Sequence, residues 1–222
     1  KKTEEGILSV DLKTGEYKPQ KKVVFDGFRA AKNFQSINNR IKALAFNDDK
    51  AGKFFWEITA DSLIYAANRI PEISDDIINI DNAMKWGYGW ELGPFECWDA
   101  MGVRSTVIRM KKENKKVPAW VDEMLSSGRE TFYELKDGEM TYYDVLTSSV
   151  KSIKQDPNII NLNLKKTSKS LIKKDWSASL IDLGDAVLNV EFHSALQPTL
   201  NPIDASMGET MNDAMDLLDS DK

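Results

Sequence analysis

The chain has 222 residues, of which 41% are hydrophobic and 29% charged, an ordinary composition for a globular protein with a buried core. Its net charge of −5 gives no global attraction to nucleic acid or to anionic membranes, and no apolar run approaches the length of a membrane span. A single cysteine, Cys97, excludes an internal disulfide framework, and a single histidine, His193, excludes a site with several histidine ligands. We therefore expect a cytoplasmic protein that binds neither nucleic acid nor membranes.

The first part of the chain predicts an extended segment followed by helices. Residues 1–22 alternate polar and apolar side chains around Thr14-Gly15, which is typical of a short hairpin or a linker. From Phe28 to Phe46, apolar residues recur every three or four positions, which predicts one amphipathic helix. A second helix is expected from Lys53 to Ile70, and Pro71 ends it.

Residues that start or stop helices bound the next elements. Ser74 is expected to cap a helix that Gly87 ends. Pro94 begins a short helix that Gly102 closes. Two more helices are expected, at about 105–115 and 118–128.

The second half of the chain has β-type patterns. Aromatic-rich arms flank Asp137-Gly138, which predicts a hairpin over 131–144. A second hairpin is expected around Gly184-Asp185, followed by a helix over about 204–218. The lysine-rich residues 150–175 are interpreted as a linker with one brief strand.

The predicted fold is therefore mainly α, with small β-hairpin additions. It has four parts: an extended segment or linker at 1–22, a helical domain at 23–149, a basic linker at 150–175, and a strand–strand–helix piece at 176–222. The last part has no core of its own, because a hairpin and one helix leave both outer faces in water. Both ends of the sequence are expected to be cuts within a longer polypeptide.

The stretch GYGWELGPFE (87–96) raises the question of a nucleotide-binding loop. Gly87, Gly89 and Gly93 follow the spacing G-x-G-x-x-x-G, one residue longer than the dinucleotide fingerprint. A helix precedes them where the fingerprint requires a strand. The glycines are interpreted as a helix stop, a turn and a new helix start.

Other chemically suggestive residues have structural explanations too. His193 could be a catalytic base, but its neighbour Ser194 points to the opposite face of a strand. Cys97 lies between Glu96 and Trp98, where nothing positive activates a thiol, so a buried structural role is favoured.

Charged and aromatic groups are interpreted in the same way. Asp75, Asp76 and Asp81 could resemble a metal cluster, but a helix N-terminus is favoured, with Asp81 on the solvated side. Five lysines of the basic linker are expected to be solvated rather than to form a phosphate or nucleic-acid site: Lys165, Lys166, Lys169, Lys173 and Lys174. Four tryptophans are expected to pack in the protein rather than to stack on ligands: Trp86, Trp90, Trp98 and Trp120. No catalytic, cofactor-binding or metal-binding residue is predicted.

One run of residues resembles a known family. IDNAMKWGYGWELGPFECWDAMGV (80–103) is similar to the signature I-D-x-A-M-x-x-G-x-x-x-x-x-G-P-F-E-x-x-D-x-x-G of the C-terminal helical domain of 3-hydroxyacyl-CoA dehydrogenases. The matching positions are Ile80, Asp81, Ala83, Met84, Gly87, Gly93, Pro94, Phe95, Glu96, Asp99 and Gly102. The resemblance implies a helical fold like the C-terminal domain of 6-phosphogluconate dehydrogenase.

A second run, SASLIDLGDAVLNVEFHS (177–194), looks like the opening hairpin of a crotonase (enoyl-CoA hydratase) domain. Together the resemblances imply a bifunctional enzyme of fatty-acid β-oxidation, of which this chain is an internal piece. They imply NAD as cofactor and a CoA thioester as substrate of the whole enzyme, and no cofactor in this fragment. The implied partners are the nucleotide-binding and hydratase domains of the same polypeptide, with a homodimer also possible.

The chain departs from the family where catalysis occurs. The family's catalytic asparagine belongs to an Asn-Arg pair early in its first long helix. Phe55-Trp56 hold that place here, and Asn68-Arg69 lie at the wrong end of the helix. The catalytic serine and histidine–glutamate pair belong to the absent nucleotide-binding half, and the hydratase glutamates would lie beyond Lys222. The resemblance therefore implies a degenerate second helical domain kept for packing.

A hypothesis from another class remains open. The chain could be a free-standing helical interaction module whose basic linker contacts an acidic partner. Salt-dependent binding of the fragment to nucleic acid or anionic lipid would favour this alternative.

Overall fold

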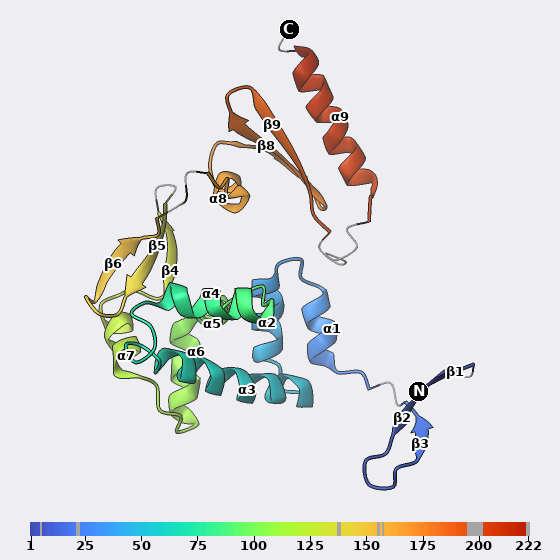
Figure 1. Cartoon of the computed structure of the whole chain (residues 1–222), viewed down its shortest axis with the longest axis vertical. Helices are drawn as coiled ribbons and strands as arrows, with labels where there is room; N and C mark the ends of the chain where they lie inside the picture. The colour runs from blue at the N-terminus through green and yellow to red at the C-terminus, as the bar shows by residue number, and fades with distance from the viewer. Residues whose placement is uncertain are drawn as a thin grey trace.

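A computed structural model of the chain describes residues 1–4, 6–20, 23–136, 139–154, 156, 158–194 and 202–220. Helices form the middle of the molecule, with β1–β3 on one side and the strands β8 and β9 with helix α9 at one end (Figure 1). The described residues thus form a mixed fold of helices and three small three-stranded sheets, which is consistent with the predicted helical domain.

The N-terminal residues form an antiparallel sheet. It consists of β1 (Lys2–Thr3), β2 (Gly6–Val10) and β3 (Tyr17–Pro19). Val10 pairs with Tyr17, and Gly15 in the connecting turn has a φ of +73°, which glycine adopts without strain. The predicted hairpin around Thr14-Gly15 is confirmed.

The prediction of a single helix from Phe28 to Phe46 is wrong. Two helices occur, α1 (Asp26–Lys32) and α2 (Ile37–Ala45). The apolar period continues across the break, so periodicity alone does not detect it. The extended backbone at Ser36 (φ −73°, ψ 133°) ends the helical path, and the Arg40 side chain donates a hydrogen bond to the carbonyl of Phe34 within the break.

Helix α3 (Lys50–Ala67) is the longest helix among the described residues, and one of its faces contributes Trp56, Ala60 and Leu63 to the buried core. It begins three residues before the expected Lys53, because Asp49 is the N-cap and accepts a hydrogen bond from the Gly52 N–H at 2.7 Å. The same carboxylate accepts one from the Gly27 N–H at 2.8 Å, which ties α1 to α3.

Four helices follow: α4 (Ile77–Tyr88), α5 (Pro94–Met101), α6 (Val103–Lys112) and α7 (Ala119–Ser126). Pro94 and Gly102 bound α5 as predicted. Two predicted boundaries of α4 are wrong. Asp76, not Ser74, caps its start, and Gly89, with a left-handed φ of +67°, ends it instead of Gly87.

The core of the helical body is aromatic at its centre. The ring of Phe132 lies 5.1 Å from that of Phe95 and 5.3 Å from that of Trp98, and all three residues are fully buried. Phe132 immediately precedes the sheet β4 (Tyr133–Lys136), β5 (Glu139–Asp144) and β6 (Ser149–Ser152). The predicted hairpin is confirmed, although its turn at 137–138 lies outside the described residues, and β6 is an additional strand.

The C-terminal part contains α8 (Leu162–Lys166), β7 (Leu171–Lys174), β8 (Ala178–Gly184), β9 (Val187–Phe192) and α9 (Ala205–Ser220). The predicted second hairpin and final helix are confirmed. Strand β7 pairs with β8, so the sheet crosses the expected linker boundary at 175/176. Helix α9 packs on β8 and β9, and its Met207 and Ala214 are buried, whereas Met215 is 54% exposed.

Candidate functional site

Asp81 is the centre of a buried joint between α4 and α5. Its Oδ1 accepts a hydrogen bond from the Phe95 N–H at 2.8 Å, and its Oδ2 accepts from the Glu96 N–H at 3.1 Å and from the Tyr133 hydroxyl at 2.9 Å. The residue is 1% exposed, so its predicted place on the solvated side is wrong. Asp81 instead satisfies the free N–H groups at the start of α5, 14 residues further along the chain.

Gly93 and Glu96 complete this joint. A β-carbon on Gly93 would lie 2.3 Å from the β-carbon of Asp81, so only glycine fits. The Glu96 carboxylate accepts a hydrogen bond from the Gly93 N–H at 2.8 Å and another from Lys85 Nζ at 2.7 Å. The glycine-rich stretch therefore forms the turn between α4 and α5, as the sequence predicted.

Asp99 attaches the sheet to the same joint. Its two carboxylate oxygens accept hydrogen bonds from the N–H groups of Phe132 at 2.7 Å and Tyr133 at 2.8 Å. The resemblance placed Asp81, Gly93, Glu96 and Asp99 in one motif, and the structure joins all four by contact or hydrogen bonds around the start of α5. These partners come from distant positions, so no local pattern could have paired them.

Burial dominates the electrostatics of the joint. It raises the pKa of Asp81 and that of Asp99 to about 7 each, although the backbone N–H groups they bind oppose the shift. Burial also raises the pKa of the Cys97 thiol to about 12, and the Asp81 charge adds to this shift. A thiol with so high a pKa is not a nucleophile near neutral pH, which agrees with the predicted structural role.

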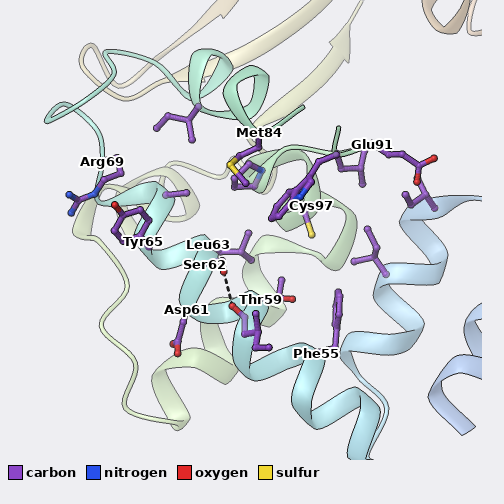
Figure 2. Close-up of a pocket in the computed structure, with 18 of the residues that line it drawn as sticks. Phe55, Thr59, Asp61, Ser62, Leu63, Tyr65, Arg69, Met84, Glu91 and Cys97 are labelled. Atoms are coloured by element: carbon purple, nitrogen blue, oxygen red, sulfur yellow. Dashed lines mark hydrogen bonds between the residues drawn. The ribbon is translucent and has the colours of Figure 1, made fainter. Parts of the chain in front are cut away.

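An apolar groove lies beside the joint, between α3 on one side and α2, α4 and the 89–92 turn on the other. Its volume is about 960 Å³, and a neighbouring hollow of about 570 Å³ shares Phe55, Ile58, Thr59 and Trp90 with it. Figure 2 shows side chains of α3 and α4 around the larger hollow. We call the two together the α3 groove; its further apolar lining includes Ile37, Ile41, Leu63, Ile80, Met84, Leu92 and Pro94.

Large apolar side chains along the α3 groove are open to solvent. Phe54, Ile58 and Tyr65 all belong to α3. Their exposed fractions are 68%, 52% and 63%. Contiguous exposed apolar surface of this kind marks an interaction face. Trp90 at the rim is 45% exposed and Trp86 80%, so the packing interpretation is wrong for these two tryptophans.

The other two tryptophans pack as predicted. Trp98 is fully buried and donates a hydrogen bond to Thr106 Oγ1 at 2.7 Å. Trp120 is partly buried, stacks on Tyr143 and donates to the Ala67 carbonyl at 3.3 Å.

Two pairs of residues, Phe55-Trp56 and Asn68-Arg69, were compared in the sequence with the family's Asn-Arg pair. Residues of both pairs make structural contacts. Trp56 is buried, donates a hydrogen bond to Glu113 at 2.6 Å and lies 4.0 Å beneath the Arg109 guanidinium. At the other end of α3, Asn68 donates to the Ile64 carbonyl, and Arg69 pairs with Glu72 at 2.7 Å. Neither pair of positions presents an amide to the α3 groove.

His193 has a different partner from the one considered in the sequence. Its Nε2 lies 3.0 Å from Ser179 Oγ, across the β8–β9 pair, rather than beside Ser194. Ser179 is fully buried and His193 is half-buried, so the serine hydroxyl does not reach the surface.

The acidic and basic groups take part in local contacts. Asp76 caps α4, and within the described ranges no group of three or more His, Cys, Asp or Glu side chains could hold a metal ion. Lys166 is ion-paired with Glu191, and Lys173 with Asp175 and Asp213, so these two lysines are not simply solvated. No helix in the described part of the chain is both long and apolar enough to cross a membrane.

These features describe a helical domain with a buried carboxylate joint and an open apolar face. Comparison with known proteins relates this domain to an enzyme family. The chain is 42% identical over 194 residues, 87% of its length, to a Bacillus subtilis (strain 168) protein named "Probable 3-hydroxyacyl-CoA dehydrogenase". That match covers 24% of the relative, so the chain spans about a quarter of the relative's length.

Shorter matches agree with this one. Over 58 residues, the chain is 43% identical to a Rickettsia felis protein and 40% identical to a Rickettsia prowazekii protein, each named "Putative fatty acid oxidation complex trifunctional enzyme". Each match covers 26% of the chain and 8% of the relative. No family model and no solved structure matches the chain. The chain is thus similar to part of a protein named as a probable 3-hydroxyacyl-CoA dehydrogenase and to part of two named as fatty acid oxidation trifunctional enzymes.

Proposed function

We propose that this chain is a packing domain of a longer NAD-dependent 3-hydroxyacyl-CoA dehydrogenase that acts in fatty-acid oxidation. The observation that carries the proposal is the 42% identity over 194 residues, within which the Asp81–Gly93 joint accounts for the family signature. In the whole enzyme, other domains would bind NAD and oxidise the 3-hydroxyl group of a CoA thioester.

The arrangement of residues in this chain supports a role in packing rather than in catalysis. Gly89 ends α4 and Gly93 begins α5, and the Gly93 N–H is already bound to Glu96, which supports a joint between helices rather than a phosphate cradle. The place of the catalytic asparagine is occupied by the partly buried Phe55 and by Trp56, whose ring nitrogen is bound to Glu113. These contacts support a role of this part of the chain in packing rather than in holding NAD or a reacting CoA thioester.

The α3 groove supports the packing role. We propose that it receives an apolar face of another helical domain, either of the same polypeptide or of a second copy in a homodimer. Phe54, Ile58 and Tyr65 would then become buried, as aromatic and aliphatic anchors of protein interfaces are.

Residues 176–222 would begin a hydratase domain. Helix α9 leaves Met211, Met215 and Leu218 between 41% and 54% exposed. Further strands and helices of a crotonase fold would cover this stripe and supply the glutamates that hydrate an enoyl-CoA.

Steady-state kinetics test the proposed function. The longer protein should reduce NAD when given 3-hydroxybutyryl-CoA, and the 222-residue chain alone should not. Turnover by the chain alone would overturn its packing role. Absence of turnover by the longer protein, with folding verified by circular dichroism, would overturn the dehydrogenase assignment.

A further inference from the structure

Three stripes of side chains run along α3, because positions three or four apart share one face of a helix. The first stripe is buried in the core and consists of Trp56, Ala60, Leu63 and Ala67. The second faces the α3 groove and is small beyond its first member; it consists of Phe55, Thr59, Ser62 and Ala66. The third consists of large side chains along the edge of the groove, and we call it the α3 ridge: Phe54, Ile58, Tyr65 and Arg69.

A ridge of large side chains beside a groove with small ones is complementary to itself. In a dimer with two-fold symmetry the same surface of both copies meets, so the ridge of each copy enters the groove of the other. The larger hollow extends along α3, with Phe55 toward one end and Arg69 at the other (Figure 2). From Phe54 to Arg69 the helix rises about 22 Å, four turns, which suits a second helix better than a small ligand.

We propose that two copies of the chain associate through this face, with their α3 helices antiparallel and the two-fold axis near Ser62. The inference rests on the proposed packing role and deepens it, because it names the partner as a second copy. Aromatic residues and arginine, which the ridge contains, are the types enriched in protein interfaces.

The antiparallel register places large side chains opposite small ones. With Ser62 at the axis, Ile58 of each copy lies opposite the partner's Ala66. Tyr65 of each copy lies opposite the partner's Thr59. Each ridge residue therefore fills space that a small groove residue leaves, and Ile58 and Tyr65, both more than half exposed in the single chain, become buried.

Charges near the ends of α3 favour the antiparallel direction. Lys50 and Lys53 are exposed at its start, and the side chain of Glu72, in the turn after its end, is 62% exposed. Antiparallel helices place Lys53 of each copy near the partner's Glu72 and also oppose the two helix dipoles. Parallel helices would bring the lysines of both copies together and set Arg69 beside Arg69.

Asp61 is the acid nearest to the proposed axis. Its carboxylate accepts a hydrogen bond from Lys115 Nζ at 2.7 Å, and the Lys115 side chain is only 13% exposed. Each copy thus brings a positive charge for its own Asp61, which offsets the repulsion between the two acids.

The association is tested first with the 222-residue chain itself. Sedimentation equilibrium should show a monomer–dimer equilibrium with a Kd of about 10 μM or tighter. Ser62→Cys, in a chain whose one native thiol is removed by Cys97→Ala, should form a disulfide-linked dimer under mild oxidation. Its rate should exceed that of Ser126→Cys, an exposed serine on α7, by about tenfold or more, because the axis holds the two thiols together.

A mixture of two variants tests the direction of the helices. Lys53→Cys and Glu72→Cys chains, both without Cys97, should cross-link to each other when mixed. Each variant alone should cross-link no faster than Ser126→Cys. All substituted positions except Cys97 are exposed, so the variants should keep the fold.

Several results would overturn the proposal. One is a chain that stays monomeric at about 100 μM, and another is equal cross-linking of Ser62→Cys and Ser126→Cys. Rapid cross-linking of Lys53→Cys with itself would show parallel helices. A monomeric chain whose groove is covered only in the longer protein would assign the groove to another domain. None of these results depends on turnover, so the dimer and the dehydrogenase assignment can fail separately.

Discussion

Gly93 and Asp81 approach so closely that a β-carbon on the glycine would lie 2.3 Å from that of the aspartate. This approach lets the Asp81 carboxylate reach the N–H groups of Phe95 and Glu96 at the start of α5. The acid on one helix and the glycine before the next are thus two halves of one joint. Their spacing in the sequence follows from the length of the turn between the helices.

Replacing Gly93 with alanine should destabilise the chain by about 3 kcal/mol, because the methyl group would collide with the Cα and Cβ of Asp81. Gly87→Ala is the matched control. Gly87 is exposed within α4 and has nothing within 4 Å of an added β-carbon, so this variant should gain up to about 1 kcal/mol. Urea unfolding measures both values, and equal midpoints for the two variants would contradict the joint as described.

Asp81→Ala should cost about 3–5 kcal/mol. The substitution leaves the N–H groups of Phe95 and Glu96 and the Tyr133 hydroxyl without their buried acceptor. Asp75→Ala, an exposed acid just before the same helix, should change stability by no more than about 0.5 kcal/mol. Thermal and urea unfolding compare them, and a mild effect of Asp81→Ala would show that water reaches the joint.

The exposed face of α3 gives a prediction about association. Ile58→Asp should weaken the concentration-dependent self-association expected of a chain with an open apolar groove, with little effect on stability, because Ile58 is already 52% exposed. Ile108→Asp on α6 is a control of the same residue type at 51% exposure. Sedimentation velocity reads out the assembly state. If both variants behave like the parent, or both change alike, the groove is not the interface.

The sequence predicted features with local causes and missed those with distant ones. Pro94 and Gly102 bound α5 as expected, since proline and glycine act on their own backbone. Asp81 was misplaced because its hydrogen-bond donors, Phe95, Glu96 and Tyr133, lie 14, 15 and 52 positions away. The break between α1 and α2 was missed because the apolar period runs through it. The α3 groove was not predicted, because a stripe that faces the core and one that faces a partner look alike in sequence.

The C-terminal part gives the last prediction, which concerns where the chain can be divided. The buried apolar cluster of the helical body extends from Ala45 to Tyr143, so residues 1–175 should remain folded when the rest is removed. The segment 176–222 loses β7, which pairs with β8 from Leu171↔Ile181 to Lys174↔Ser179, and keeps a two-stranded hairpin with one helix, an assembly that is marginal in water. It should therefore show no cooperative thermal transition by circular dichroism. A longer segment, 158–222, restores β7 and α8 and should recover measurable strand content, because β8 is buried and needs a neighbour on each side. A sharp melt of 176–222 would mean that α9 and the hairpin suffice as a core, and the exposed Met211–Leu218 stripe would then need no further domain to cover it.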